Sequence, residues 1–149
     1  MNFITENKID KKNKNKTEKY SNLINKYFEK YKDFFSNIES KAVFLEGVLA
    51  GFLLEMQRIQ NPDKKGNEAF WSSLHNLRVD NRILLELFPK IVNKLKQLQR
   101  PYTNLVSEIS RYLQDAGIKW KLSNIELSWY FTHGLASYKY FKKRRGKKK

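Results

Sequence analysis

The sequence predicts an all-α protein, and three observations support that prediction. Apolar residues recur every three or four positions over most of the chain, which is the period of an amphipathic helix. No segment alternates apolar and polar residues between turn signals, so no β-strand is expected. The chain has 149 residues and no cysteine, and a chain of this length can fold as one domain without disulfides. We therefore expect a single bundle of about six or seven helices with disordered basic termini.

The central helix of this bundle is expected at residues 41–60. Between residues 42 and 54 the only charged residue is Glu46, so no wide polar stripe remains, as is typical of a helix surrounded by others. Gly47 and Gly51 lie one turn apart and favour the close approach of another backbone. A membrane span is not expected, because the uncharged part is shorter than the roughly 18 to 20 residues that a span requires.

An aromatic stripe before the central helix predicts one amphipathic helix, followed by a break at residues 36–40. At helical spacing such a stripe is more typical of a core than of a base-stacking surface. Residues 1–16 are rich in Lys and Asn and poor in apolar side chains, so they are predicted to be disordered. The stripe consists of Tyr20, Leu23, Ile24, Tyr27, Phe28, Tyr31, Phe34 and Phe35.

Turn and cap signals divide the middle of the chain. Pro62 and Gly66 predict a loop at residues 61–67, and a short helix is expected at residues 68–77. Asp80 is a candidate N-cap, flanked by Val79 and Leu84 as a hydrophobic staple. The helix that begins there is expected to end at Pro89.

Pro89 and Pro101 are each expected to begin a new helix as its first residue, since proline lacks the N–H that interior positions need. The two helices are predicted at residues 90–99 and 102–116, and Gly117 is expected to terminate the second.

The last helix is predicted to run from Ser123 to Phe141. Ser123 and Glu126 have the spacing of a capping box, in which each side chain bonds the backbone N–H of the other residue. Residues 118–122 form a short connector. The domain is thus expected at residues 17–141, followed by a basic tail at residues 142–149.

The net charge of +15 is unevenly distributed. Residues 21–89 contain nine basic and nine acidic residues, whereas residues 90–121 contain seven basic residues and two acidic ones. The tail adds seven more basic residues. Segregation of this kind is typical of a protein that binds a polyanion along one surface.

Catalytic motifs are lacking. His75 and His133 have no metal-ligand spacing and no adjacent nucleophile motif, so both are interpreted as structural histidines. There is no glycine-rich phosphate loop and no carboxylate cluster for two-metal chemistry. No enzymatic activity, no metal and no cofactor are therefore expected.

The candidate site is a nucleic-acid-binding surface. On a helical wheel, residues 90–100 place Ile91, Val92, Leu95 and Leu98 on one side and only cations and amides on the other. A solvated helix face that happens to lack acids is the alternative interpretation. Trp120 is more typical of a core anchor than of a base-stacking residue. The predicted DNA-binding residues are Lys90, Lys94, Lys96, Arg100, Arg111, Lys119 and Lys121.

Three segments resemble a CRISPR-associated family. They are KAVFLEGVLAGFLLEMQRIQ, AFWSSLHNLRVDNRILLELFPKIVNKLKQ and GIKWKLSNIELSWYFTHGLA. A Gly-containing apolar helix, a Phe-Trp pair, an Arg-rich turn before LFP and the run W-K-L-S-x-x-E-x-x-x-Y-F follow in this order. Together they resemble the C-terminal part of the large subunit of type I-B CRISPR effector complexes, and the stand-alone small subunit of these Cascade complexes, over residues 40–141.

The resemblance implies a cytoplasmic, non-catalytic subunit of an RNA-guided surveillance complex. Its implied partners are the crRNA-containing complex with its large and backbone subunits, the target and non-target DNA strands, and another copy of itself, without a membrane. The large subunit's N-terminal region, which recognises the PAM, has no counterpart here. The implied role is therefore to stabilise the R-loop, and a separately made C-terminal piece fits the size.

Two other hypotheses remain open. The chain is alternatively a structural helical bundle whose basic surface contacts an acidic protein partner, or a free-standing DNA- or RNA-binding protein. Gel shifts with and without crRNA-bound partners separate the three.

Overall fold

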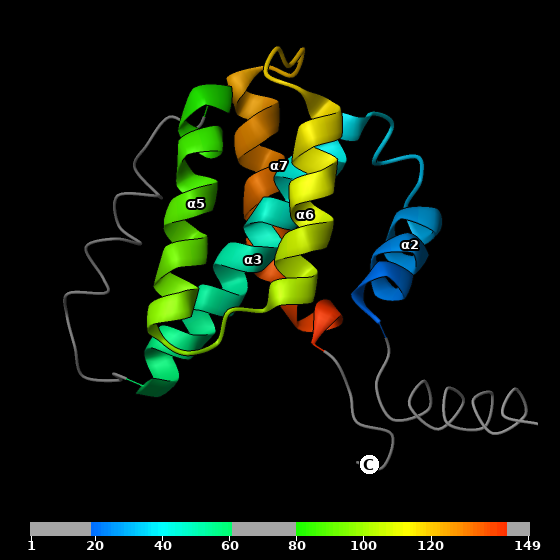
Figure 1. The fold of residues 1–149 in the computed structure, drawn as a ribbon. Coiled ribbons are helices and arrows are strands. Elements are labelled where there is room, and N and C mark those ends of the chain that lie inside the picture. The colour runs from blue at the N-terminus through cyan, green and yellow to red at the C-terminus, as the bar shows by residue number, and fades with distance from the viewer. Residues whose placement is uncertain (1–18, 61–79, 143–149) are drawn as a thin grey trace, which may run out of the picture.

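The computed structural model describes residues 19–60 and 80–142, and within these ranges the protein is all-α. Within the described ranges, five α-helices and one 3-10 helix follow in order. Their bounds are Tyr20–Lys30 for α2, Ile38–Gln60 for α3, Asn81–Gln97 for α5, Thr103–Ala116 for α6, Asn124–Ser137 for α7 and Tyr138–Phe141 for η1. In Figure 1, α3 passes between the pair α5 and α6 on one side and α7 on the other, with α2 at the edge.

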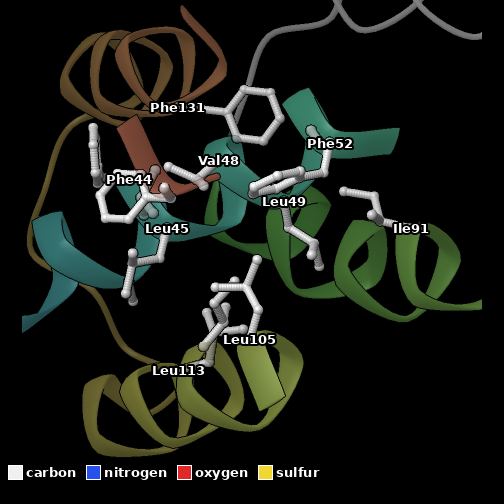
Figure 2. Close-up of a cluster of buried hydrophobic side chains, with 14 of the residues drawn as sticks. Phe44, Leu45, Val48, Leu49, Phe52, Ile91, Leu105, Leu113 and Phe131 are labelled. Carbon is white, nitrogen blue, oxygen red and sulfur yellow. The ribbon is translucent and has the colours of Figure 1, made fainter. Parts of the chain in front are cut away.

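The core is organised around α3, as the sequence predicts. Nearly every α3 residue from Ala42 to Leu53 is buried, and α3 packs against α5, α6 and α7. Figure 2 shows Leu49 of α3 among side chains from the neighbouring helices, including Ile91 of α5, Leu105 of α6 and Phe131 of α7. Because α3 is apolar on all sides, its surface is stable only when other helices cover it on all sides, and α5, α6 and α7 do so.

Glycine allows the backbones of α3 and α7 to approach closely. A Cβ atom at Gly47 would lie 2.1 Å from the carbonyl oxygen of Phe131, and one at Gly134 would lie 2.0 Å from that of Phe44. The close backbone approach predicted at Gly47 is thus confirmed, and Gly134 is its counterpart on α7. Gly51 instead faces the side chain of Tyr138.

The successive contacts advance in the same direction along both helices, so α3 and α7 run parallel. Gly47 lies against Phe131 and Leu135, and Gly51, one turn later on α3, lies against Tyr138, which directly follows α7.

Most of the aromatic stripe packs in or against the core, although Tyr31 is exposed, and the helix that holds the stripe is shorter than predicted. α2 ends at Lys30, and Tyr31 to Phe34 form a turn. The Tyr27 ring stacks on Phe44 with centroids 4.9 Å apart, and Phe28 meets Phe35 at 4.8 Å. The turn lets Phe35 fold back onto these rings, a placement that tertiary packing favours over continuing the helix.

The central helix begins earlier than the predicted break allows. Asn37 accepts a hydrogen bond from the backbone N–H of Ser40 through its Oδ1 atom at 2.8 Å. Asparagine in this role satisfies an N–H that the first turn of a helix leaves without a partner. The break therefore ends at Asn37, and Ile38 is already helical.

The prediction that Pro89 divides two helices is wrong. A single helix, α5, contains Pro89 in its interior. Proline there removes one backbone hydrogen bond at a cost of about 3 kcal/mol. Four buried leucine and isoleucine side chains on both sides of Pro89 form one stripe against α3, and each contributes roughly 1.5 to 3 kcal/mol, so packing offsets the cost. These residues are Leu84, Leu87, Ile91 and Leu95.

The second proline is also placed differently. Pro101 precedes the N-cap of α6, Tyr102, which adopts a left-handed conformation with φ 48°. Pro101 is therefore not the first helical residue. Gly117 does terminate α6, with φ 75°, a conformation that favours glycine.

The remaining caps are confirmed. Asp80 accepts from the N–H of Ile83 at 2.8 Å. Both bonds of the capping box between Ser123 and Glu126 are present, but α7 ends at Ser137 and the 3-10 helix η1 continues to Phe141.

Several expectations lie outside the described residues. They are the disordered segment at residues 1–16, the short helix at residues 68–77 with His75, the staple partner Val79, and the tail beyond Lys142. Within residues 19–60 and 80–142, no helix is long and apolar enough to cross a membrane.

Candidate nucleic-acid interface

Helix α5 holds most of the predicted binding residues on its outer side. Its inner side is anchored on α3 by the buried stripe described above. Lys90 and Lys96 are exposed, Lys94 is half-buried, and Arg100 is exposed just beyond the helix end. The burial pattern therefore turns the cations of α5 away from the core.

The cations spread around the outer half of α5 instead of forming one tight cluster. At 100° per residue, Lys90 and Lys96 point about 120° apart. Asn93 and Gln97 lie between them and are exposed. A broad arc of this kind suits a curved polyanion better than a single small anion, because no three cations converge on one point.

One ion pair on this face was missed by the sequence reasoning. Since α5 is continuous across Pro89, its outer side also includes Arg82 and Glu86, which pair at 3.3 Å between Nε and Oε2. Glu86 is four residues before Lys90, so an acid does lie one turn from the predicted surface. The unbroken spacing of apolar residues across Pro89 is the signal that would have revealed it.

The C-terminal end of α5 places two of the cations near partial negative charge. Lys94 and Lys96 lie in its last turn, where cations interact favourably with the helix dipole. Gln99 then adopts φ 61°, and the N–H of Arg100 donates to the carbonyl oxygen of Leu95 at 3.0 Å. The turn thereby fixes the backbone at Arg100 while leaving its side chain exposed.

The connector at residues 117–123 lies at the opposite end of α5. The side-chain amide of Asn81 donates to the carbonyl oxygen of Ile118 at 2.8 Å. The backbone N–H of Lys121 donates to Glu39 at 3.2 Å, and both Lys119 and Lys121 are exposed. Two further cations are thus held where α5 begins.

Trp120 is an anchor in this connector. Its Nε1 donates to the carbonyl oxygen of Gly117 at 2.8 Å, and the half-buried ring packs against the core cluster. The predicted structural role is confirmed. The ring holds the backbone between Lys119 and Lys121 in place.

Arg111 lies on α6, apart from the α5 cations. It forms an ion pair with Glu108 on its own helix, and Asp115 is exposed one turn further on. The two acids offset the charge of Arg111, so its contribution to a basic surface is smaller than that of the α5 residues.

His133 has a structural environment. Its Nε2 lies 3.3 Å from the hydroxyl of Tyr27, and its ring packs against Phe34 and Phe44. Burial lowers the pKa of the His133 imidazole, which favours the neutral form at pH 7. In the part of the chain that the structure describes, no three His, Asp or Glu side chains group to hold a metal ion.

Comparison with known proteins gives one match. No curated protein and no solved structure matches the chain. A family model, described as the C-terminal domain of the CRISPR-associated protein TM1802 (cas_TM1802), matches residues 1–149. That match agrees with the CRISPR-associated resemblance found in the sequence, and it extends over the two termini. The chain therefore belongs to the family of the TM1802 C-terminal domain and is a CRISPR-associated protein.

Proposed function

We propose that this protein is a non-catalytic, small-subunit-like component of a type I-B CRISPR surveillance complex, and that it stabilises the R-loop by binding DNA strands without sequence preference. The observation that supports the proposal is the set of exposed cations on the outer side of α5 and just beyond its end, Lys90, Lys96 and Arg100, with Lys119 and Lys121 exposed in the connector that is bonded to the start of α5.

The dimensions of this set suit a nucleic-acid backbone. The 17 residues of α5 span about 25 Å at 1.5 Å per residue, which corresponds to about seven base pairs at 3.4 Å each. Lysine and arginine neutralise phosphates, and the amides of Asn93 and Gln97 can bond sugar or phosphate oxygens. Contacts of this kind position a strand and do not select its sequence.

The energetic role follows from the balance of R-loop formation. A guide–target heteroduplex is about as stable as the DNA duplex that it replaces. Protein contacts with the separated strands are then sufficient to shift the equilibrium, and target choice is left to base pairing and PAM recognition elsewhere in the complex.

The first prediction concerns direct DNA binding. If four to six cations contact phosphates, log K should fall with log salt at a slope of roughly −4 to −5. Replacing Lys90, Lys94, Lys96 and Arg100 together by Gln should weaken binding at low salt and reduce the slope by about 3 to 4. Helicity should be unchanged, because none of the four side chains belongs to the buried stripe of α5. Fluorescence anisotropy with labelled DNA over a salt series measures both quantities.

A matched variant controls for net charge. It removes four exposed cations that lie outside α5, in and around α2 and on η1, and should retain most of the binding. Equal losses in both variants would mean that charge alone matters, and a strong preference for one DNA sequence at fixed salt would contradict the proposal. The control replaces Lys19, Lys30, Lys32 and Lys139 by Gln.

The variant in which Lys90, Lys94, Lys96 and Arg100 are replaced by Gln is called the α5 variant. In the assembled complex, it shows whether this surface binds DNA or contacts a protein. It should assemble normally yet give less full R-loop on relaxed plasmid, with partial rescue by negative supercoiling, which supplies unwinding free energy. Equal R-loop yields for variant and wild type on relaxed plasmid would mean that this face does not hold DNA. A defect in assembly itself would instead favour the acidic protein partner.

The second prediction concerns the basic tail. Lys142 belongs to the folded part, because its Nζ lies 2.9 Å from Glu55 Oε2 and this hydrogen bond raises the pKa of Lys142. Truncation after Lys142 removes the other six basic residues of the tail. We expect weaker DNA binding at low salt and unchanged assembly, measured by anisotropy and gel filtration. Failure of the truncated chain to assemble would assign the tail to a protein or RNA partner.

A further inference from the structure

Three elements meet at the lower end of the bundle in Figure 1, namely the end of α3, the connection between α5 and α6, and η1. Two half-buried tyrosines lie where they meet. Tyr102, at the start of α6, and Tyr138, at the start of η1, both pack against Phe52 of α3, with their ring centroids 4.9 and 5.6 Å from that of Phe52. Packing on one phenylalanine therefore holds the two tyrosines close to each other.

An ion pair lies beside both tyrosines. The Nζ of Lys142 is 2.9 Å from Oε2 of Glu55, and the Lys142 side chain is 48% exposed. The hydrogen bond with Glu55 raises the pKa of Lys142 against the effect of burial, and interactions with Tyr138 and Tyr102 raise it further. The Lys142 ammonium group is therefore near both tyrosine hydroxyls.

Two arginines complete the group. Burial raises the pKa of Tyr102, and the positive charge of Arg100 opposes that rise. Burial also raises the pKa of Tyr138, and Arg58 is among the charges that oppose it. Both arginines are exposed, and neither forms an ion pair with another described residue. We call the following four residues the end cluster: Arg58, Arg100, Lys142 and Glu55.

The backbone holds Arg100 in place within this cluster. Its N–H donates to the carbonyl oxygen of Leu95 at 3.0 Å, and Pro101, which follows it, restricts its backbone to extended conformations. Gln99 and Tyr102, on either side of this pair, have φ angles of 61° and 48°, which residues other than glycine rarely adopt. Strained conformations of this kind occur where the position of a side chain matters for binding.

The end cluster differs from the cations of α5, which spread over a broad arc. Here three cations gather around one carboxylate, so the arrangement suits a single compact anion. Phosphate oxygens accept short, charge-assisted hydrogen bonds from guanidinium and ammonium groups. A partly exposed ion pair such as that of Glu55 contributes little to stability, so an anion of higher charge can displace the carboxylate.

We propose that the end cluster binds a single phosphate group, and that in the free protein the Glu55 carboxylate occupies the position of that group against Lys142. The phosphate group can come from the interior of a nucleic-acid strand or from its terminus. Such a site does not require that α5 bind DNA, because Arg58, Lys142 and Glu55 lie on other elements.

Inorganic phosphate is the probe that tests the site. Titration of the full chain at constant ionic strength, followed by amide-resolved NMR, should shift the amide signals of Arg58, Arg100 and Lys142 along a saturating curve. Arg58→Gln should weaken phosphate binding by about tenfold, because it removes one charge-assisted hydrogen bond. The matched control is Arg82→Gln, which removes an exposed arginine outside the end cluster. It should leave the dissociation constant unchanged.

The role of Glu55 gives a change of opposite sign. Glu55→Gln removes the competing negative charge, so phosphate should bind more tightly by about threefold or more. The matched control is Glu29→Gln, which makes the same change in net charge at a carboxylate paired with Lys32 near α2. Phosphate affinity of that control should equal that of the wild type.

Single-stranded oligonucleotides with and without a terminal phosphate distinguish the two sources of the group. If the terminus is bound, the phosphorylated strand should bind more tightly, and Arg58→Gln should abolish the difference. If an internal phosphate is bound, Arg58→Gln should weaken binding of both strands equally. Either result supports the site.

Three outcomes would overturn the proposal. One is the absence of saturable shifts at the end cluster, another is an equal loss of phosphate affinity in Arg82→Gln and Arg58→Gln, and the third is weaker phosphate binding in Glu55→Gln. None of them bears on the salt dependence expected for α5. Conversely, saturable phosphate binding without any affinity for DNA would support this site and contradict the proposed function.

Discussion

Gly47→Ala is expected to destabilise the protein by about 3 kcal/mol or more, although alanine is the better helix former by about 1 kcal/mol. The new Cβ would lie 2.1 Å from the Phe131 carbonyl oxygen, and a backbone atom cannot rotate away. Relief requires α3 and α7 to separate, which breaks the most extensive helix pair in the described structure. Gly134→Ala should behave similarly, since it approaches Phe44 from the other helix. Urea unfolding followed by circular dichroism measures the loss.

Gly51→Ala is the matched control for this prediction. It is also on α3 and one turn away, but its Cβ would meet the side chain of Tyr138 at 2.7 Å. The atoms it meets are Cβ, Cγ and Cδ1, at the base of the Tyr138 side chain, so relief requires a shift of the short 3-10 helix η1. The overlap is smaller than the 2.1 Å contact at Gly47, so the destabilisation should also be smaller. If Gly47→Ala is as stable as the wild type, the close α3–α7 crossing is not needed for the fold.

Glu46→Leu is expected to stabilise the protein at pH 7 by about 1 to 3 kcal/mol. Glu46 is fully buried, and neither carboxylate oxygen has a hydrogen-bond partner within the described part of the chain. Leucine is of similar size and leaves no unsatisfied polar atom. Thermal and urea unfolding of variant and wild type measure the gain, and a destabilised variant would mean that the carboxyl group has a partner.

The pH dependence gives a second measurement at the same residue. Burial raises the pKa of the Glu46 carboxyl well above its ordinary value of 4.5, so the folded state binds this proton more tightly than the unfolded state. The contribution is favourable below about pH 4.5 and is lost as the pH rises through the folded-state pKa, by up to about 1.4 kcal/mol per pH unit. Glu46→Gln cannot titrate. As the pH rises from about 4.5 to the folded-state pKa of Glu46, the wild type should therefore lose stability relative to Glu46→Gln. A stability difference that stays constant with pH would contradict the prediction.

The sequence by itself determined the helices whose signals are local. The all-apolar composition around Glu46 identified the central helix, because such a surface is stable only when it is covered on all sides. Asp80, Ser123 with Glu126, and Gly117 marked helix ends, because a cap acts within three or four residues. The family was also visible in the order of short motifs.

Tertiary structure decided the features that depend on distant residues. Pro89 does not end α5, because four apolar residues on both sides of it pack onto α3 and offset the lost hydrogen bond. Gly134 gave no signal by itself, since its role exists only opposite Phe44. α2 ends at Lys30 because Phe35 packs better against Phe28 and Phe44 from a turn.

The candidate site shows the same division. Its cations were found from composition, because charge segregation is a property of the sequence. Their arrangement required the fold: packing on α3 keeps α5 continuous across Pro89 and so brings Glu86 beside Lys90, and the connector with Lys119 is tied to the start of α5 by Asn81. The pair of Arg111 with Glu108 is by contrast local, because the two residues are three apart on one helix. Ion pairs and close contacts between elements depend on three-dimensional distance, which no local pattern specifies.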